Sequence, residues 1–307
     1  MNVSLIGGTG FVGSHLVDRL LADGHSPKLL VRPHRGERSA SLDHCATVSG
    51  DVGDLRALER CASGADAVIY LIGILREDPA RGATFEELQW RGVERTIAAA
   101  KTAGVRRFLL MSANGVKANG TPYQRTKFLA EEALKTSGLD WTIFRPSVIF
   151  GDPQGHMEFC SQLKRDIIDS PLPAPLFYPG LLPLNAGGFE LAPVAVGDVA
   201  AAFALALARP DTIGETYPLC GPRAHTWKDI LGTIAAACGR TKLMLPAPAL
   251  AVQAAAAVLD RFPWFPITRD QITMLLEGNE CEEGNGFERL GLLPSPFDAE
   301  ALAYLRH

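Results

Sequence analysis

The first half of the chain alternates short apolar stretches with longer stretches of helical periodicity. Parallel strands that are buried on both faces have continuous apolar character, and the helices between them are rich in residues that favour helix formation. Strands are expected at Val3–Ile6, Lys28–Val31, Thr47–Ser49, Ala67–Ile72, Arg107–Met111 and Trp141–Arg145, and helices at Phe11–Asp23, Leu55–Ala62, Thr84–Ala103 and Tyr123–Ser137. The alternation predicts an α/β fold, a doubly wound parallel sheet.

This alternation of strands and helices ends after Gly151. A Pro-rich segment at 170–188 is expected to be irregular chain that shapes a pocket. The segment 193–210 has the pattern of a strand end followed by a helix. We therefore expect a first domain at 1–150, completed by 189–220. Residues 151–188 and 221–307 are expected to form a smaller, mostly helical domain for a substrate or partner.

Charge and composition exclude several classes of function. The chain has 307 residues and a net charge of -4, so no basic excess is available to neutralise nucleic acid. The six cysteines form no CxxC pair and no zinc spacing, so no metal site is predicted and a reducing cytoplasm fits best. The start, MNVSLIGG, lacks the pattern of a signal peptide.

One apolar run, Leu243–Leu259, approaches the length of a membrane span but is interrupted by two prolines and Gln253. The first interpretation is a buried or interface helix. The alternative is peripheral contact with the inner membrane, to which Phe262, Trp264 and Phe265 would contribute.

A glycine motif follows the first predicted strand. Gly7, Gly10 and Gly13 form GxxGxxG directly before an amphipathic helix. Gly7 permits a tight turn, Gly10 lets the backbone approach a pyrophosphate, and Gly13 lets the helix pack against the strand. The helix N-terminus adds free N–H groups and a positive dipole end. The motif predicts a Rossmann domain that binds a dinucleotide.

The end of the second strand bears on the choice of dinucleotide. A carboxylate here would accept the ribose 2′-OH of NAD, but the sequence runs Val31, Arg32, Pro33, His34, Arg35. A guanidinium suits a 2′-phosphate, which favours NADP(H), with NAD(H) as the second choice. The alternative is that both arginines are solvated surface charges.

Two aspartates follow the third strand. Asp51, with Val52 beside it, can accept a hydrogen bond from the adenine amino group. Alternatively, Asp51 or Asp54 caps the next helix, and Asp54 is well placed for this.

A tyrosine and a lysine open the predicted helix after the fifth strand. Tyr123 and Lys127 form YxxxK, a spacing that places both on one helix face. The ammonium is expected to lower the pKa of the phenol, so that Tyr123 serves as acid or base near neutral pH. The lysine also reaches the nicotinamide ribose.

These motifs, with GDVGDL, VIYLIGIL, RRFLLMSA and TIFRPSVIFGDP, resemble the extended or atypical short-chain dehydrogenase/reductases, the NAD-dependent epimerase/dehydratase family. PVAVGDVA, ETYPLCGP, LPAPAL and ITRDQITML are similar to bacterial relatives of the 39 kDa accessory subunit of respiratory complex I. The resemblance implies cofactor roles for Gly7, Thr9, Gly10, Phe11, Val12, Gly13, Arg32, Asp51, Val52, Leu71, Ile72, Gly73, Tyr123, Lys127, Pro146, Ser147 and Val148.

The sequence departs from this family where active members polarise the substrate. Ala113 occupies the usual Ser or Thr position at the end of the fifth strand, with Ser112 one residue before it and Asn114 one residue after it. Gln89 replaces an Asn that is often found in the fourth helix of active relatives. Tyr123, Lys127 and Ser112 are therefore the candidate catalytic residues.

Three functions follow from these observations. The first is an NADP(H)-dependent oxidoreductase, or an epimerase- or dehydratase-like enzyme, acting on a carbonyl, alcohol or quinone-type substrate. The second is an NADP(H)-binding protein without turnover that assists a respiratory complex or quinone biosynthesis. The third is an NADP(H) redox sensor, which comparable affinities for NADP⁺ and NADPH would argue against.

Overall fold

The computed structural model describes residues 1–33, 43–180, 182–259, 267–281 and 284–306. The described chain divides into two compact units, each discontinuous in sequence. Unit 1 comprises Met1–Pro146, Val196–Leu219 and Gly286–Leu292, and unit 2 comprises Ser147–Ala195, Cys220–Asn285 and Leu293–His307.

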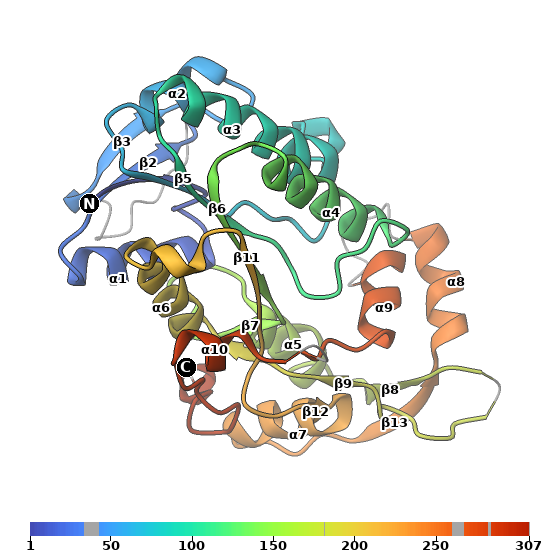
Figure 1. Ribbon diagram of the computed structural model, residues 1–307. Coiled ribbons are helices and arrows are strands. Elements are labelled where there is room, and N and C mark those ends of the chain that lie inside the picture. The colour runs from blue at the N-terminus through green and yellow to red at the C-terminus, as the bar shows by residue number, and fades with distance from the viewer. Residues whose placement is uncertain (34–42, 181, 260–266, 282–283, 307) are drawn as a thin grey trace. The chain divides into compact units, whose positions relative to one another are not determined.

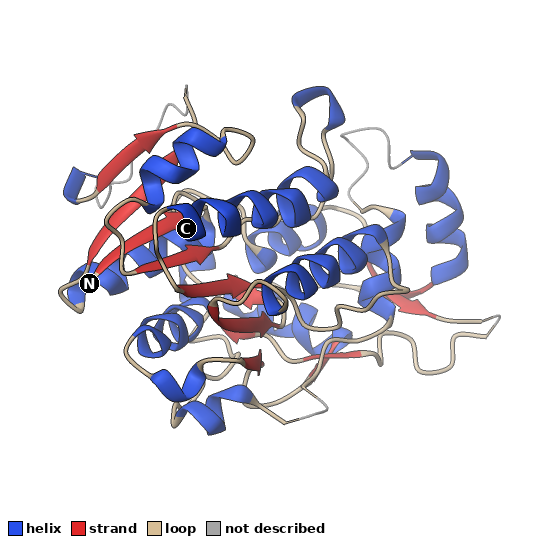
Figure 2. Ribbon diagram, turned by 45° about the horizontal axis from the view of Figure 1, so that its top comes forward, coloured by secondary structure: helices blue, strands red, loops and turns tan. Residues whose placement is uncertain are grey.

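Unit 1 contains a seven-stranded sheet in the order β11-β6-β5-β4-β1-β2-β3, and every neighbouring pair is parallel (Figures 1 and 2). The strands are β1 (Asn2–Ile6), β2 (Ser26–Val31), β3 (Ala46–Ser49), β4 (Ala67–Tyr70), β5 (Arg107–Met111), β6 (Asp140–Pro146) and β11 (Glu215–Leu219). The predicted doubly wound Rossmann sheet is confirmed. The strand order reverses between β1 and β4, which is where this fold binds nucleotides.

Helices cover both faces of the sheet (Figure 1). Helices α1 (Phe11–Ala22) and α6 (Val196–Leu207) pack together on one face, and α2 (Leu55–Ala62), α3 (Gly92–Thr102) and α4 (Pro122–Lys135) lie on the other. The remaining helical segments of this unit are η2 (Pro79–Arg81), η3 (Glu86–Arg91), η5 (Pro210–Thr212) and α10 (Gly286–Leu290). Tyr70, Phe108 and Ile143 are fully buried beneath the second helix layer.

The helix predicted at Thr84–Ala103 is divided: η3 is a π-helical turn, and α3 follows it. The buried hydroxyl of Tyr70 donates a hydrogen bond to the carbonyl of Leu88 inside this turn. A Cβ on Gly92 would lie 2.3 Å from the Tyr70 hydroxyl oxygen, so only glycine fits where α3 begins.

Unit 2 is built from short pairs of strands and from helices. Its strands are β7 (Ile149–Phe150), β8 (Ala174–Tyr178), β9 (Glu190–Leu191), β10 (Val194–Ala195), β12 (His225–Thr226) and β13 (Met244–Pro248). Its helices are α5 (Phe159–Leu163), η4 (Lys164–Ile168), α7 (Trp227–Ala237), α8 (Ala249–Leu259), α9 (Arg269–Leu276) and η6 (Ala303–Arg306). Trp227 anchors the core: its ring stacks with those of Phe177 and Phe189, and its N–H donates to the Pro175 carbonyl at 2.9 Å.

Two expectations for this unit need correction. The Pro-rich segment 170–188 is not wholly irregular, because β8 lies within it and pairs in parallel with β13. The apolar run Leu243–Leu259 is helical only from Ala249, since the prolines at 246 and 248 fall in β13. Phe262, Trp264 and Phe265 lie outside the described residues.

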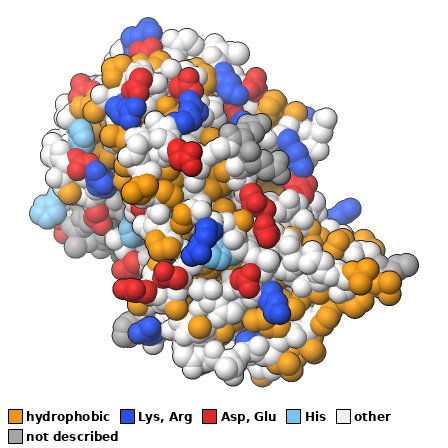
Figure 3. Space-filling view, turned by 60° about the horizontal axis from the view of Figure 1, so that its bottom comes forward, with side chains coloured by type: hydrophobic (Ala, Val, Ile, Leu, Met, Phe, Trp, Pro, Cys, Tyr) orange, Lys and Arg blue, Asp and Glu red, His pale blue; other side chains and the backbone are white. Residues whose placement is uncertain are grey.

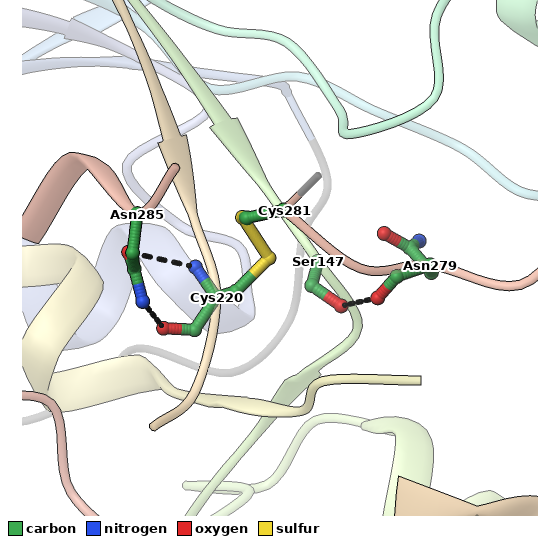
Figure 4. The surroundings of a disulfide bond; sticks show 5 residues. All are labelled: Ser147, Cys220, Asn279, Cys281 and Asn285. Carbon is green, nitrogen blue, oxygen red and sulfur yellow. Dashed lines mark hydrogen bonds between the residues drawn. A yellow bond between two sulfur atoms is a disulfide. The ribbon is translucent and has the colours of Figure 1, made fainter. Parts of the chain in front are cut away.

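A disulfide joins Cys220 to Cys281 within unit 2, which the cysteine spacing gave no reason to expect (Figure 4). The side chain of Asn285 binds both backbone groups of Cys220, accepting from its N–H at 3.4 Å and donating to its carbonyl at 2.8 Å. The bond and this amide together hold the chain after α9 against the start of the segment that leads to β12. The remaining cysteines are free thiols.

Candidate functional site

The turn between β1 and α1 has the backbone shape that a phosphate loop needs. Gly7 has φ +94°, in the left-handed region that favours glycine. A Cβ on Gly13 would lie 2.3 Å from the Gly7 carbonyl oxygen and 2.7 Å from the backbone of Gly8. The first turn of α1 therefore packs on the backbone of the loop itself, whereas the sequence interpretation had it packing on the strand.

The N-terminus of α1 has its first N–H groups available for an anion. Gly10 is the N-cap and offers no side chain to cap them, and the first turn contains no acidic residue. The N–H groups of Phe11, Val12 and Gly13 precede the first position that can bond within a helix. Their dipoles and the positive end of the helix suit a pyrophosphate. Thr9 lies half-buried in the same turn.

The segment after β4 lies against this loop. A Cβ on Gly7 would be 2.9 Å from a side-chain carbon of Ile72, and the N–H of Leu71 donates to the Ile6 carbonyl at 2.8 Å. Leu71 is buried, Ile72 half-buried and Gly73 exposed. The structure therefore brings two of the predicted cofactor segments together at the reversal of strand order.

The predicted adenosine-side residues lie at the ends of β2 and β3. Arg32 is exposed directly after β2, and His34 and Arg35 lie outside the described residues. Asp51 is exposed and accepts from the Gly53 N–H at 2.8 Å, and Val52 is buried. The Asp54 carboxylate accepts from the Ala57 N–H at 3.0 Å, which confirms this residue as the cap of α2.

Helix α4 begins with a complete capping box. The Thr121 hydroxyl accepts from the Gln124 N–H, the Gln124 side chain accepts from the Thr121 N–H, and Pro122 occupies the first turn. Such a box satisfies two N–H groups that would otherwise lack partners and fixes where the helix starts. It thereby fixes the helical positions of Tyr123 and Lys127.

The Lys127 ammonium is almost fully buried, with 2% of the residue exposed. It donates to the carbonyls of Ile72 at 3.2 Å and Met111 at 3.0 Å, and so joins the segment after β4 to the end of β5. Burial disfavours the charged form and lowers the pKa of Lys127 to about 8, while the charge of Glu131 opposes this shift.

The Tyr123 and Phe85 rings form a T-shaped pair, with 5.8 Å between their centroids. Burial raises the pKa of the Tyr123 phenol to about 12. The direction is opposite to the expected one, because burial disfavours the charged tyrosinate. At neutral pH the phenol is therefore a proton donor.

Ser112 brings a hydroxyl to the end of β5. Its N–H continues the sheet by donating to the Phe144 carbonyl at 2.7 Å, but its buried hydroxyl has no hydrogen-bond partner among the described residues. Buried hydroxyls almost always have a partner, so an unpartnered one marks a place for a ligand group or water. Ala113 and Asn114 follow it half-buried, and the Asn114 N–H is used by the Pro146 carbonyl at 2.9 Å.

Gln89, which takes the place of the family's Asn, is buried in η3. Its amide donates to the Ile74 carbonyl at 2.7 Å, and its oxygen accepts from the Thr126 hydroxyl at 3.3 Å. Thr126 neighbours Lys127 on α4. Two successive residues of this helix therefore connect to the carbonyls of the segment 72–74, a link that the sequence interpretation missed.

The last predicted cofactor segment crosses a unit boundary. Pro146 ends unit 1, and Ser147 and Val148 open unit 2. Within unit 2 the Ser147 hydroxyl donates to the Asn279 carbonyl at 3.0 Å (Figure 4), and the Val148 carbonyl accepts from the Val194 N–H at 2.9 Å.

A second missed feature is an acidic residue one turn after the lysine. Glu131 is fully buried, and both of its oxygens accept from the Arg145 guanidinium, at 2.8 and 2.6 Å. The spacing from Lys127, four residues along one helix, was the available signal.

Comparison with known proteins agrees with this geometry. A family model described as NAD(P)H-binding matches residues 7–166, which contain the glycine loop, the tyrosine and the lysine. The chain belongs to the NAD(P)H-binding family. The resemblance to the extended short-chain dehydrogenase/reductases is supported by this family model together with relatives that are named as sugar epimerases, one of which, from Bacillus subtilis, is 32% identical over 55% of this chain and 82% of its own.

Relatives differ in how much of their length is matched. A ceramide reductase of Caulobacter vibrioides is 33% identical over 48% of this chain and 46% of its own. The NAD(P)H azoreductase of Xenophilus azovorans is 28% identical over 78% of this chain and 74% of its own. The mitochondrial NADH-ubiquinone oxidoreductase 40 kDa subunit of Neurospora crassa is 24% identical over 99% and 78%.

Among solved structures, the Thermus thermophilus UDP-glucose 4-epimerase in complex with NAD is similar to this NAD(P)H-binding protein over 100% of this chain and 98% of that one. The TM-score is 0.74 at 22% identity, which establishes a common fold.

The part of the chain that the structure describes holds no cluster of three or more His, Cys, Asp or Glu side chains arranged for a metal ion. None of its helices has both the length and the apolar character of a membrane span.

Proposed function

We propose that this NAD(P)H-binding protein is an NADP(H)-dependent reductase of a carbonyl or quinone-type substrate. The main observation in favour of this proposal is the unpartnered hydroxyl of Ser112. This residue follows Met111, whose carbonyl binds the Lys127 ammonium. A buried donor, on the residue next to the one whose carbonyl binds a buried cation, suits a substrate oxygen on which negative charge develops. The neutral phenol of Tyr123 supplies the proton that reduction of this oxygen requires.

The residues fit the cofactor. The glycine turn leaves no room for a Cβ at residues 7 or 13, and the first N–H groups of α1 suit a pyrophosphate. When bound, a nicotinamide cofactor supplies the hydride. The chain's own residues orient the substrate oxygen through Ser112, stabilise its charge through Lys127 and protonate it through Tyr123.

NADP(H) is preferred in this proposal because of the residue after β2. Arg32 is exposed there, and no Asp or Glu lies between residues 26 and 33 to accept a ribose 2′-hydroxyl. A guanidinium binds a phosphate through two hydrogen bonds and carries a full charge.

Relatives support reduction. The Xenophilus protein is described as an NAD(P)H azoreductase and the Caulobacter protein as a ceramide reductase, and they match 78% and 48% of this chain.

The test is anaerobic mixing of the protein with NADPH and a panel of short-chain quinones and aldehydes, followed by absorbance of the reduced nicotinamide. Tyr123→Phe is expected to retain NADPH binding and to lower kcat about 100-fold or more. Tyr217→Phe, which removes the same hydroxyl from β11, is the matched control and is expected to keep wild-type turnover. Equal turnover in both variants would remove Tyr123 from the chemistry.

A second candidate function is an NADP(H)-binding accessory protein that meets a respiratory complex or the membrane surface. The observation in its favour is exposed apolar surface on unit 2, where hydrophobic side chains gather toward the lower right of Figure 3. The segments 171–188 and 243–259 contain no charged residue. Their exposed leucines among the described residues are Leu172, Leu182, Leu184, Leu243, Leu245 and Leu250.

Patches of this kind on a protein surface mark binding sites. Sedimentation with inner-membrane vesicles tests this candidate, with and without NADPH. Leu182→Asp and Leu250→Asp are expected to remain in the supernatant. Leu293→Asp, at a position that is 94% exposed but outside both segments, is the control and should sediment like wild type. Tight NADPH binding without turnover on any substrate, together with vesicle binding, would favour this candidate over the reductase.

A further inference from the structure

Helix α4 carries a carboxylate that is removed from solvent and paired with a cation. Glu131 has no exposed surface, and its two oxygens accept from the two nitrogens of the Arg145 guanidinium in a bidentate pair. Lys135 lies 3.5 Å away at the edge. A buried acid is costly unless it is paired, so the chain has placed Glu131 here with a partner from β6.

Lys127, one turn earlier on the same helix, is a buried cation whose hydrogen-bond partners are uncharged. Its two hydrogen-bond acceptors are backbone carbonyls, which orient the ammonium but carry no net charge. Glu131 lies four residues further along α4, on the same helix face, and both side chains are buried, so little solvent separates the two charges. The negative charge of Glu131 therefore counters the effect of burial on the ammonium.

The other titratable groups on the elements around Lys127 are already engaged. On β4, the hydroxyl of Tyr70 is bound to the Leu88 carbonyl, and on α3, Arg95 is paired with Glu87. On β6, Arg145 is paired with Glu131. On α4 itself, the neutral phenol of Tyr123 contributes no charge.

We propose that Glu131 is a positioning residue that keeps the Lys127 ammonium positively charged within the cofactor site, with Arg145 holding the carboxylate in place. The assignment of Lys127 to a cofactor site rests on the proposed function, whereas the electrostatic link between Glu131 and Lys127 does not. Glu131 acts through the lysine and touches neither cofactor nor substrate.

The neighbouring residue provides a matched control. Glu132 has the same side chain on the same helix, but 46% of that side chain is exposed and it pairs with Lys135 at 2.9 Å. Glu131→Gln and Glu132→Gln remove the same charge and keep nearly the same volume. They differ in whether the lost charge faces Lys127 from inside the protein, where screening is weak.

The experiment follows the protonation of Lys127 directly, without cofactor. The full-length protein is labelled with lysine carrying ¹³C at the ε carbon, and the resonance that disappears in Lys127→Arg is titrated by NMR. We expect the midpoint in Glu131→Gln to fall by about one pH unit or more from wild type, a tenfold loss of the protonated form on the alkaline side. In Glu132→Gln it should stay within a few tenths of a unit, and in Glu131→Asp it should return toward wild type.

A folded Glu131→Gln protein with the wild-type midpoint would overturn the proposal and leave the pair a structural contact only. Should this variant not fold because Arg145 is left unpaired, the double variant Glu131→Gln/Arg145→Met removes both charges. Replacing a whole buried pair is tolerated far better than removing one partner. A fall of the midpoint in the same direction is then expected, smaller because a positive charge is lost together with the negative one, and an unchanged midpoint overturns the proposal.

A second readout connects the link to binding. NADPH affinity, measured by fluorescence across pH, should begin its alkaline decline about one unit earlier in Glu131→Gln than in wild type. A wild-type protein that binds no NADPH would refute the proposed function while the NMR midpoints still decide the role of Glu131.

Discussion

At the scale of single residues, burial moves the two candidate catalytic groups in opposite directions. The pKa of Tyr123 rises to about 12 and that of Lys127 falls to about 8, because the interior disfavours tyrosinate and ammonium alike. Near pH 7 the resting pair is therefore a neutral phenol beside a mostly charged ammonium. This is the protonation state that reduction of a carbonyl needs, and the state that oxidation of an alcohol must first change.

The pH dependence of reduction should follow the lysine. The active form has Lys127 charged, so kcat/KM for the reductase reaction is expected to be level below pH 8 and to decline as pH rises through about 8. Tyr123 adds no second step until far higher pH. In Lys127→Arg, whose guanidinium stays charged, the decline should disappear between pH 7 and 10 even if the plateau is lower. A decline at the same pH in both proteins would mean that another group titrates.

The residue after β2 is expected to select between the two dinucleotides. Replacing Arg32 by Ala removes the charge proposed to bind the 2′-phosphate, and hydrogen bonds to charged groups contribute about 1.5–3 kcal/mol. The Kd for NADPH should therefore rise by roughly 10- to 100-fold, while the Kd for NADH, which lacks this phosphate, should stay unchanged. Calorimetric titration of both cofactors checks this, and equal weakening of both would place the effect on folding or on a shared group.

At the scale of elements, the sequence identified six of the seven sheet strands because each is a short apolar stretch bounded by turn residues. It also placed α1, α2 and α4 to within about two residues, the usual uncertainty of helix ends. The helix expected over 84–103 shows where local pattern is insufficient. Its first part is a π-helical turn, and the hydroxyl of Tyr70, a strand residue distant in sequence, binds a carbonyl within it.

The features of the candidate site also differ in whether they could be predicted from local sequence patterns. The glycine turn and the YxxxK spacing are local patterns and could be found in the sequence. The pairing of Glu131 with Arg145, the contact of Gln89 with the Ile74 carbonyl and the raised pKa of Tyr123 depend on elements that meet only in the folded chain.

Alanine substitutions at two glycines of the phosphate loop should have different effects, one on stability and the other on NADPH binding. A Cβ at Gly13 would meet the Gly7 carbonyl oxygen at 2.3 Å, so Gly13→Ala must displace α1 and is expected to lower the free energy of unfolding by about 1–3 kcal/mol. A Cβ at Gly10 has its nearest neighbour at 3.4 Å. Gly10→Ala should fold with near wild-type stability but bind NADPH at least tenfold more weakly, because the added methyl group occupies the approach to the pyrophosphate.

Chemical denaturation and NADPH titration of both variants check this contrast. If Gly10→Ala binds NADPH like wild type, the pyrophosphate does not lie over this turn.

At the scale of the whole molecule, the disulfide could not be predicted from the sequence. Its cysteines are 61 residues apart, and spacing alone allows any pairing among the six cysteines. Closing a loop of this length stabilises a folded protein by about 4 kcal/mol in the chain-entropy model. The expectation of a fully reduced chain therefore differs from the structure, and the difference is measurable.

We expect Cys220→Ser to lower the midpoint of the unfolding transition of unit 2. A dithiol reductant should lower the midpoint of the wild-type protein to the same value. Cys45→Ser, which removes a half-buried free thiol from unit 1, should leave both midpoints unchanged. Unfolding is followed by circular dichroism with and without reductant, and alkylation in denaturant without reductant counts the free thiols, two of which, Cys61 and Cys160, are buried in the folded protein. Six alkylated cysteines in protein purified without reductant would exclude the bond.

The division of the chain among the two units also governs how the protein is made. The chain passes between them after residues 146, 195, 219, 285 and 292. The edge strand β11 and helix α6 therefore reach the ribosome exit long after the rest of the sheet, and α10 follows later still. During synthesis the edge of β6 stays open until Ser147–Ala195 of unit 2 and then β11 have emerged, and α10 completes unit 1 only after Cys220–Asn285 has followed. A fragment ending at residue 146 would keep the glycine loop, Tyr123 and Lys127 but expose that edge, and we expect it to aggregate where the full chain remains in solution.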